Sequence, residues 1–514
     1  MWNESVVNRL NEKLNASKNG GGAKRIEKQH ASGKLIARER LEILFDEGTF
    51  VEVGGLIESR ITDFGLEDKK VPGDGVVTGY GKINGRIAFA SSEDFTVIGG
   101  TLGEYHSLKI CRIMDMAYET GAPFISINDS GGARIEEGIC SLSGYSGIFY
   151  RNTKMSGVVP QISVILGPCA GGACYSPAIS DFIFMSRDSS YMFITGPQVV
   201  KAVTGEEVTQ KELGSADVHM NKSGVNHFVY DNDEKCLLGV RELLSYLPQN
   251  FEEKPKAETF NYSKQGDDLQ EIISDNQRKT YNVKQLIDNL IDDDSFFEVQ
   301  KEFAKNMVVG FARLNGECIG IVANQPNHLG GSIDCNSSDK AARFIRFCDC
   351  FNIPILSLVD VTGFLPGKSQ EHQGIIRHGA KVLYAYSEAT VPKISLITRK
   401  AYGGAYIAMN SKNMGADIVF AWPIAQMAVM GAEGAVDIIF RRQIEVAQDK
   451  QAERERLICE YEDKFMNPYI AAAHGYVDEI IMPEDSRDRI IKAFDMLKTK
   501  NVERPCKKHG NMPL

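Results

Sequence analysis

Two distant stretches of this chain follow one pattern. Residues 392–409 read PKISLITRKAYGGAYIAM, and residues 160–178 read PQISVILGPCAGGACYSPA. Each stretch begins with a proline, continues as an apolar run typical of a buried strand, and reaches a glycine pair. Small residues follow each pair and indicate the start of a helix. The sequence therefore predicts a strand, a Gly-Gly-Ala turn and a helix in both places.

The two stretches belong to a longer internal repeat. Several positions of the first half recur in the second at one constant offset: Gly79, Asn84, Gly85, Gly99, Gly100 and Lys109 match Gly310, Asn315, Gly316, Gly330, Gly331 and Lys340. Pro123 matches Pro354 at the same offset. A nearly constant offset over so many positions does not arise by chance, so we expect two copies of one fold.

Strands and helices are expected to alternate within each copy. In the first copy, helical periodicity in residues 108–118 precedes a buried-strand pattern in residues 124–127, and a second strand pattern covers residues 162–166. Residues 1–45 indicate further helices, with a break at the glycines of residues 20–22. This alternation favours an α/β fold in which helices cover a sheet.

The polar stretch 252–282 is the best candidate for a linker, because it is charged and lacks apolar periodicity. A helical pattern in residues 283–291 and a strand-like pattern after it open a second globular segment. We therefore predict two domains, residues 1–258 and residues 265–514.

Each copy is expected to place two turns next to each other. One turn follows the first buried strand and comprises residues 130–133 in the first copy and 362–365 in the second. The other is the Gly-Gly-Ala turn at the start of a helix, where backbone N–H groups lack intrahelical acceptors. One N–H from each turn would meet at a single oxygen, which is the minimum geometry of an oxyanion hole. The alternative is that the glycines only allow close packing of strand and helix.

Side chains offer little evidence of acid–base catalysis. The sequence has no GxSxG elbow, P-loop, HExxH motif or complete dinucleotide-binding glycine fingerprint. His372 and His378 would face different sides of a helix, and His378 is more typical of a packed or capping residue. Glu136 and Glu137 could supply a base beside the first turn or stabilise a helix dipole. Backbone N–H groups remain the better candidates, and they suit an enolate whose proton acceptor belongs to a cofactor.

Charge and cysteine usage exclude several classes of protein. The formal net charge of −10 argues against nucleic-acid binding, and no apolar run approaches the roughly 18 residues that span a bilayer. The N-terminus lacks the apolar core of a signal peptide, so we expect a cytoplasmic protein. The eleven cysteines include no CxxC pair, and Cys348 and Cys350 would point to different faces of a helix, so no metal site is expected.

Three basic residues, Lys34, Arg38 and Arg40, cluster in the segment GKLIARERLEILF. They could form a solvent-exposed helix face, or they could hold a phosphate-bearing cofactor. The spacing alone leaves both interpretations open.

Motifs throughout the chain resemble those of one known family. From about Arg25 to the end, the sequence contains GKLIARERLEILFDEGTFVE, PGDGVVTGYGKINGR, EDFTVIGGTLGE, DSGGARIEEG, GPCAGGACYSPA, GFLPG, QEHQGIIRHGAK, RKAYGGAY and KKHGNMPL. These motifs are similar to those of the carboxyltransferase (beta) subunits of biotin-dependent acyl-CoA carboxylases, of the propionyl-CoA carboxylase beta and methylmalonyl-CoA decarboxylase alpha type. The resemblance implies two tandem crotonase-like domains, which agrees with the internal repeat.

The resemblance also implies which residues form the site. The N-terminal domain would hold the acyl-CoA thioester oxygen through Gly131, Gly132, Ala133, Gly171, Gly172 and Ala173. The C-terminal domain of a neighbouring subunit would hold the biotin ureido oxygen through Gly363, Phe364, Gly403, Gly404 and Ala405. Further cofactor-binding residues would be Lys34, Arg38, Arg134, Tyr175, Tyr402, Tyr406 and Ile407. The active site would lie at a dimer interface within a hexamer of two stacked trimers.

The reaction that the resemblance implies is carboxyl transfer. Release of CO2 from N1-carboxybiotin would free a nitrogen to remove the α-proton of the acyl-CoA, and the enolate would then attack CO2. The chain has no Met-Lys-Met biotin-attachment motif and no ATP-grasp elements, so biotin carboxyl carrier and biotin carboxylase subunits are expected as partners. In reverse, the chemistry fits the alpha subunit of a sodium-pumping decarboxylase, which would lie peripheral to the membrane on membrane subunits.

Two positions depart from the family pattern. Ile407 stands where many propionyl- and acetyl-CoA carboxylases have aspartate near the acyl pocket, and Val361-Thr362 stands where Val-Pro is common. These differences leave the acyl group open. Two other classes remain as alternatives: a non-catalytic scaffold subunit, which the intact turns argue against, and a hydratase- or isomerase-like enzyme, which would need a buried Glu or Asp base.

Overall fold

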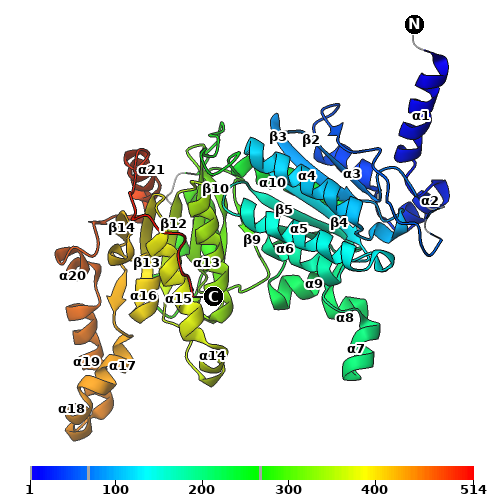
Figure 1. Cartoon of the computed structure of the whole chain (residues 1–514). Coiled ribbons are helices and arrows are strands. Elements are labelled where there is room, and N and C mark those ends of the chain that lie inside the picture. The colour runs from blue at the N-terminus through cyan, green and yellow to red at the C-terminus, as the bar shows by residue number, and fades with distance from the viewer. Residues whose placement is uncertain (1–2, 66, 68–69, 265–268, 514) are drawn as a thin grey trace. The chain divides into compact units, whose positions relative to one another are not determined.

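The computed structural model in Figure 1 describes residues 3–65, 67, 70–264 and 269–513. The chain divides into two compact units, Met1–Lys254 (unit 1) and Pro255–Leu514 (unit 2). Each unit is built on its own eight-stranded sheet with helices packed on it, so the predicted α/β class is confirmed. The predicted start of the second domain, residue 265, lies outside the described residues.

The sheet of unit 1 has the strand order β1-β2-β3-β4-β5-β6-β8, and β7 pairs with β5. An antiparallel hairpin joins β2 to β3, and the later strands pair in parallel. The strands are β1 (Val51–Glu52), β2 (Val76–Ile83), β3 (Arg86–Glu93), β4 (Phe124–Ser130), β5 (Gln161–Ala170), β6 (Phe182–Ser186), β7 (Tyr191–Phe193) and β8 (Phe228–Tyr230). The α-helices are α1 (Glu4–Lys18), α2 (Ala23–Ala31), α3 (Ala37–Leu44), α4 (Glu104–Thr120), α5 (Ile139–Met155), α6 (Tyr175–Ile179), α7 (Pro197–Thr204), α8 (Gln210–Gly214), α9 (Ala216–Val218) and α10 (Asp233–Tyr246).

The sheet of unit 2 repeats this plan, with the order β16-β14-β13-β12-β11-β10-β9 and with β15 paired to β13. The strands are β9 (Phe297–Val299), β10 (Met307–Leu314), β11 (Glu317–Asn324), β12 (Ile355–Val361), β13 (Lys393–Tyr402), β14 (Ile418–Ala421), β15 (Gln426–Ala428) and β16 (Glu479–Ile480). The α-helices are α11 (Leu269–Ile272), α12 (Val283–Leu290), α13 (Cys335–Cys350), α14 (Lys368–Gln373), α15 (Ile375–Glu388), α16 (Gly403–Ala408), α17 (Ala432–Ile439), α18 (Arg441–Val446), α19 (Lys450–Phe465), α20 (Pro468–Ala473) and α21 (Ser486–Met496).

The repeated hairpin has the same turn in both units. Asn84-Gly85 joins β2 to β3, Asn315-Gly316 joins β10 to β11, and all four residues have positive φ. An Asn-Gly pair favours this two-residue turn because both central residues need positive φ. The carboxylate of Asp46 accepts hydrogen bonds from both turn N–H groups in unit 1, and Asp292 does the same in unit 2. The predicted internal repeat is therefore confirmed.

Most predicted elements are confirmed. The helical pattern in residues 108–118 lies within α4, and the two predicted strands lie within β4 and β5. The predicted linker 252–282 is partly wrong, because Leu269, Ile273 and Tyr281 are buried in the core of unit 2. Leu269 and Ile273 have the i, i+4 spacing of a helix, but so short a segment within a charged stretch did not indicate burial. No helix in the described part of the chain is long and apolar enough to span a membrane.

The cores explain the long apolar runs before each Gly-Gly pair. Strands β5 and β13 are central and parallel, so both of their faces are covered and nearly every residue is buried. In unit 1, Ile110 of α4 and Ile148 of α5 pack with Phe124 and Ile165 of the sheet. Figure 1 shows α4 and α5 lying along the strands whose ends carry the predicted turns.

Candidate active site

The strand before the first turn loses its regular pairing at an aspartate in both units. The register between β4 and β5 shifts around Asp129, and the register between β12 and β13 shifts around Asp360. The two aspartates are separated by the offset of the repeat and so occupy equivalent positions. The chain leaves the sheet directly after each break, at the predicted turns 130–133 and 362–365.

A glycine allows the chain to approach each break closely. A Cβ on Gly100 would collide with the carbonyl oxygen of Asp129, and a Cβ on Gly331 would collide with that of Asp360. Both glycines also have positive φ, +63° and +74°. The backbone of the turn therefore requires glycine at positions 100 and 331.

The first turn of unit 1 directs one backbone N–H away from its neighbouring segment. The Leu102 N–H donates to Gly132 O at 2.9 Å, and the Arg134 N–H donates to Leu102 O at 2.9 Å. In such a parallel bridge, the central residue turns its own N–H to the opposite side, so the Ala133 N–H points away from Leu102. This N–H donates to no acceptor among the described residues.

Unit 2 repeats this arrangement. The Ile333 N–H donates to Gly363 O at 3.0 Å, and the Leu365 N–H donates to Ile333 O at 2.8 Å. Phe364 is the central residue, and its N–H likewise has no acceptor in the described part of the chain. Ala133 and Phe364 occupy equivalent positions in the two copies, so the repeat preserves the position of this donor.

The Gly-Gly-Ala turns begin helices at the ends of the next strands. In unit 1 a 3₁₀ helix, η4 (Gly171–Cys174), follows β5, and in unit 2 α16 follows β13. Gly171 and Gly403 have φ of +66° and +60°, which glycine adopts without strain. The N–H groups of the next two residues lack intrahelical acceptors. These residues are Gly172, Ala173, Gly404 and Ala405.

The two turns of each unit lie side by side. A Cβ on Gly132 would lie 2.9 Å from the carbonyl oxygen of Ala170, which directly precedes the Gly-Gly pair. In unit 2 the Phe364 ring lies 3.9 Å from the position of a Cβ on Gly404. The two turns of each unit are therefore adjacent, which an oxyanion hole made from both turns would require.

Two of the residues predicted in the first turn have their N–H groups already engaged. The Gly131 N–H donates to Gly99 O at 3.0 Å, and the Gly132 N–H donates to Ser130 Oγ at 3.1 Å. These residues therefore shape the turn. Ala133 is left as the residue of this turn whose N–H could face a ligand.

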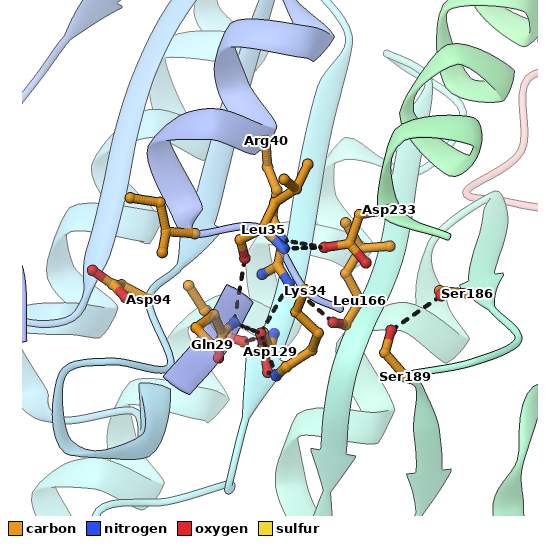
Figure 2. Close-up of polar contacts among 12 residues, drawn as sticks. Gln29, Lys34, Leu35, Arg40, Asp94, Asp129, Leu166, Ser186, Ser189 and Asp233 are labelled. Atoms are coloured by element: carbon orange, nitrogen blue, oxygen red, sulfur yellow. Dashed lines mark hydrogen bonds and ion pairs between the residues drawn. The ribbon is translucent and has the colours of Figure 1, made fainter. Parts of the chain in front are cut away.

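A buried ion cluster holds Asp129 directly before the first turn, as Figure 2 shows. The fully buried carboxylate accepts hydrogen bonds from Lys34 Nζ at 2.8 Å, Arg40 Nη2 at 3.0 Å and Gln29 Nε2 at 3.0 Å. Arg40 Nε also donates to Asp233 at 2.9 Å. Burial lowers the pKa of Lys34, although the charge of Asp129 opposes this shift. A solvent-exposed face is therefore the wrong interpretation for Lys34 and Arg40.

Two other predicted cofactor ligands are also ion-paired within unit 1. Arg38 donates to both carboxylate oxygens of Glu52, at 2.8 and 3.0 Å. Arg134 is 1% exposed and donates to Asp74 at 2.9 Å and Glu137 at 2.7 Å. The geometry gives both arginines a structural role, and Arg134 has its role next to the first turn.

A basic cavity of about 620 Å³ adjoins the ion cluster. Its lining includes Arg25, Lys28, Lys34 and Phe95, and the Lys34 ammonium lies 4.4 Å from the centre of the Phe95 ring. Gly99, whose carbonyl holds the first turn, also lines the cavity. Sequence reasoning missed the two residues of α2, because a polar helix with scattered charges does not indicate a cavity.

A second cavity, of about 640 Å³, adjoins the Gly-Gly-Ala turn of unit 2. Tyr406 and Ile407 line it beside Gly403 and Gly404. Much of the remaining lining is apolar: Met427, Ala428, Val429, Phe465, Ile470 and Ala471. Tyr402 is 9% exposed and donates its hydroxyl to Gln426 Oε1, so it supports the turn from the core.

Tyr175 occupies the position in unit 1 that is equivalent to Ile407 in unit 2. It begins α6 directly after η4 and is 47% exposed. Its ring meets that of Phe149 edge-on, with centroids 6.1 Å apart.

The side chains considered as bases are engaged elsewhere. Glu137 accepts hydrogen bonds from Arg134 and from Ser59, and Glu136 is exposed. His378 Nδ1 lies 2.8 Å from Asp339, which matches the prediction of a packed residue.

Sequence reasoning did not single out Glu93, a buried carboxyl at the end of β3. Among the residues that the structure describes, no three His, Cys, Asp or Glu side chains gather as metal ligands would.

Comparisons with known proteins identify the family of this chain. The chain matches the carboxyl transferase domain family over residues 28–512. It is 56% identical over 516 residues to the propionyl-CoA carboxylase carboxyltransferase subunit of Haloferax mediterranei, with 100% of both chains covered. It is also 56% identical over 499 residues to methylmalonyl-CoA decarboxylase subunit alpha of Propionigenium modestum, with 96% of each chain covered.

Among solved structures, the chain is similar to transcarboxylase 12S, described as a hexamer with methylmalonyl-CoA and methylmalonic acid bound. The TM-score is 0.97 and the identity 52%, and the match covers 100% of this chain and 99% of that chain. The predicted family and the predicted pair of tandem crotonase-like domains are both confirmed.

Proposed function

Because the chain belongs to the carboxyl transferase domain family, we propose that it moves a carboxyl group between biotin and the α-carbon of a short-chain acyl-CoA. The carboxyltransferase activity follows from the family, while the biotin, the acyl-CoA and the residue roles belong to the proposal. One observation carries these roles: each unit has a pair of adjacent turns that leaves backbone N–H groups for a single oxygen.

In unit 1 we assign the acyl-CoA thioester oxygen to the N–H groups of Ala133, Gly172 and Ala173. Removal of the α-proton places negative charge on this oxygen. Donors held by the backbone stabilise that charge without rearranging, and loss of one such donor lowers turnover by about 10²–10³-fold. Gly131, Gly132 and Gly171 act on the same oxygen indirectly, because they shape the two turns.

The basic cavity of unit 1 supports a nucleotide-bearing ligand. Coenzyme A carries several phosphate charges, and Arg25, Lys28 and Lys34 bring positive charge to the cavity wall. The Phe95 ring adds an apolar surface beside them. Arg134 contributes indirectly, by fixing Asp74 and Glu137 next to the first turn, and Arg38 holds Glu52 of β1.

The residues beside the second Gly-Gly-Ala turn fit biotin. The mostly apolar lining suits the hydrocarbon chain and fused rings of biotin, and the N–H groups of Phe364, Gly404 and Ala405 suit its ureido oxygen. Bound biotin supplies the carboxyl group and the ring nitrogen that accepts the substrate proton. This unit holds the ureido oxygen on those N–H groups, with Gly363 and Gly403 shaping the turns. Tyr406 and Ile407, which line the cavity, position the biotin ring and limit access of water, and Tyr402 supports the turn from the core.

The direction of the reaction has two candidates. The carboxylase and decarboxylase relatives are equally similar, at 56% identity. The second candidate function is therefore that of a decarboxylase alpha subunit, in which the same site removes the carboxyl group from a methylmalonyl-type thioester. Ile407 lines the second cavity and is where we expect the acyl group to be selected.

The partners are part of the proposal. The transcarboxylase 12S relative is described as a hexamer, which supports a hexamer of this chain. In that hexamer, we propose, unit 1 of one copy meets unit 2 of another copy. Biotin would arrive on a carrier subunit, with either a biotin carboxylase or membrane decarboxylase subunits completing the complex. A cytoplasmic location, peripheral to the membrane in a decarboxylase, fits these partners.

A decarboxylation assay tests the proposal. Purified protein with free biotin and methylmalonyl-CoA should release propionyl-CoA, detected by chromatography, and omission of biotin should abolish the release. Malonyl-CoA and glutaconyl-CoA in the same assay identify the acyl group. Failure to release the decarboxylated thioester from all three substrates contradicts the proposed function, and hydration of crotonyl-CoA would indicate a hydratase instead.

A further inference from the structure

Glu93 lies at the point where the first turn of unit 1 is anchored. It is the last residue of β3, and it is 5% exposed. Its Oε2 accepts a hydrogen bond from the Asp129 N–H at 2.9 Å. Asp129 is the residue at which β4 loses its regular register with β5, so the Glu93 side chain fixes the backbone where the turn begins.

Unit 2 holds the equivalent backbone with a neutral amide. Asn324 is the last residue of β11, occupies the position equivalent to Glu93 in the repeat, and is fully buried. Its Oδ1 accepts a hydrogen bond from the Asp360 N–H at 3.3 Å, and its Nδ2 donates to Gly331 O at 3.2 Å. The repeat therefore places a side chain that can both accept and donate at this position.

The second oxygen of Glu93 faces a nitrogen that has no partner. Glu93 Oε1 lies 3.8 Å from His106 Nε2, and that buried nitrogen has no hydrogen-bond partner among the described residues. His106 Nδ1 lies 3.0 Å from the carbonyl oxygen of Asp74, which can only accept, so Nδ1 carries the proton. Nε2 is thus an acceptor, and between these two side chains only a protonated Glu93 can supply the hydrogen.

The charges around Glu93 favour its neutral form. Asp129 faces it with a negative charge, and the opposing Arg40 is already shared between Asp129 and Asp233. Burial raises the pKa of Glu93 to about 8, and burial also lowers the pKa of His106 well below its usual value.

Two other titratable groups face Glu93. They are the Tyr145 hydroxyl of α5 and the Cys169 thiol of β5. Neither brings a positive charge that would favour the carboxylate.

We propose that Glu93 is a positioning residue that holds the acyl-side turn as a neutral carboxylic acid, accepting from the Asp129 N–H and directing its O–H toward His106 Nε2, 3.8 Å away. The proposal rests on the proposed function, because it assigns this turn to the oxyanion hole. Loss of the proton to solvent removes the donor and places a second negative charge beside Asp129. The turn then shifts, and the Ala133 N–H no longer meets the thioester oxygen.

The first test compares Glu93→Gln and Glu93→Ala across pH 6 to 9.5, with kcat/KM for methylmalonyl-CoA as the readout. Glutamine reproduces the acceptor and the donor of the neutral acid but cannot ionise. The wild type should lose activity as pH rises through about 8. Glu93→Ala should be at least tenfold less active at every pH, and Glu93→Gln should rescue most of that loss and show no such fall. Glu47→Gln, at an exposed position of the same unit, should keep the wild-type profile.

Two outcomes would overturn the proposal. One is a fall in Glu93→Gln at the same pH as in the wild type, which would assign the titration to another group. The other is Glu93→Gln as inactive as Glu93→Ala while its circular dichroism is that of the wild type, since a neutral side chain would then not suffice.

A second readout is independent of the reaction. Because the folded-state pKa is raised above the usual value, the stabilising proton is present at low pH and is lost as pH rises through about 8. The wild-type Tm should therefore fall between pH 6 and 9, and the fall should be smaller in Glu93→Gln. Equal falls in both proteins contradict the inference about Glu93. If the Tm values differ as expected but no substrate is decarboxylated, the proposed function fails while the role of Glu93 in holding the turn stands.

Discussion

The two Gly-Gly-Ala sites share a backbone but differ in what supports it. In unit 1, Asp129 pairs with Arg40, which comes from α3, outside the repeated sheet. In unit 2, Asp360 pairs at 3.0 Å with Arg399 of β13, the strand that runs into the turn. The unit 1 equivalent of Arg399 is Gly167, where a side chain would occupy the space of the Asp129 carboxylate. The aspartate therefore pairs with an arginine from a different element in each unit, although the turn itself is the same.

This difference shows which features the site needs. The repeat retains the positive-φ glycines, the two adjacent turns and the outward N–H groups, although the charges behind them changed. We therefore propose that the backbone donors are the functional element and that the side chains packed against the turn are alternative means of holding it. The unit 1 turn depends on more buried charge, so we expect it to respond more strongly to pH and to loss of a charge.

Removal of the buried aspartates should give the largest difference between the units. Asp129→Ala leaves both Lys34 and Arg40 without their shared carboxylate, whereas Asp360→Ala leaves one arginine. Breaking a buried ion pair costs about 3–5 kcal/mol, so we expect Asp129→Ala to lose at least this much and more than Asp360→Ala. Urea unfolding at pH 7 measures both losses. Equal losses would show that the extra charges of unit 1 do not support its turn.

Transfer of the unit 1 acid to unit 2 should have an intermediate effect. Asn324→Asp places a buried carboxyl next to Asp360, and burial keeps such a group protonated at neutral pH. As pH rises, ionisation should disturb the turn and lower the biotin-dependent rate by about tenfold, which corresponds to about 1.4 kcal/mol. The pH profile of kcat measures the effect. A profile identical to that of the wild type would mean that a charge at this position does not disturb the turn.

Two buried lysines at equivalent positions of the repeat, Lys109 and Lys340, should show the smallest difference between the units. Lys109 Nζ donates to Gly73 O and Val76 O, and Lys340 Nζ donates to Gln300 O and Phe303 O. Burial lowers the pKa of Lys109 to about 8 and that of Lys340 to about 7.

A lowered folded-state pKa means that the stability linked to the neutral lysine is present at high pH and is lost as pH falls through that value. The loss should therefore extend to lower pH for Lys340 than for Lys109. Differential scanning calorimetry from pH 6 to 10 should show a flatter stability profile for Lys340→Met and Lys109→Met than for the wild type, with the larger change in Lys340→Met. Unchanged profiles in both variants would contradict the assignment.

The backbone of the site was predictable from the sequence because its requirements are local. Gly100 and Gly331 must have positive φ and no side chain, so each copy retains glycine at the same offset. The apolar runs before the two Gly-Gly pairs likewise reflect the burial of central parallel strands. Because both copies have the same backbone requirement at these positions, the same residue types recur in the sequence.

The side chains that hold the turns were not predictable, because their contacts join residues that are distant in the sequence and follow no pattern. Arg40 and Asp129 are 89 residues apart, and no spacing rule relates a helix outside the repeat to the end of a strand. Glu93 is one carboxylate among many in the sequence, and only its burial beside His106 distinguishes it. The linker was partly wrong for a related reason, since Leu269 and Tyr281 reach the core from segments too short to show a clear period.

The central claim is that the Gly-Gly-Ala turn of unit 1 holds the thioester oxygen and that of unit 2 holds the ureido oxygen. A pair of valine variants tests this claim most directly. A Cβ on Gly172 would lie 3.2 Å from the Tyr145 ring, whereas one on Gly404 has no neighbour closer than 3.9 Å, so Gly404→Val should fold normally and block only the approach of an oxygen. We expect Gly404→Val to bind methylmalonyl-CoA with wild-type affinity in calorimetry, yet to lose about 10²-fold or more in biotin-dependent release of propionyl-CoA. Gly172→Val should lose both. Full activity in both variants, or loss of acyl-CoA binding in Gly404→Val, would contradict the account.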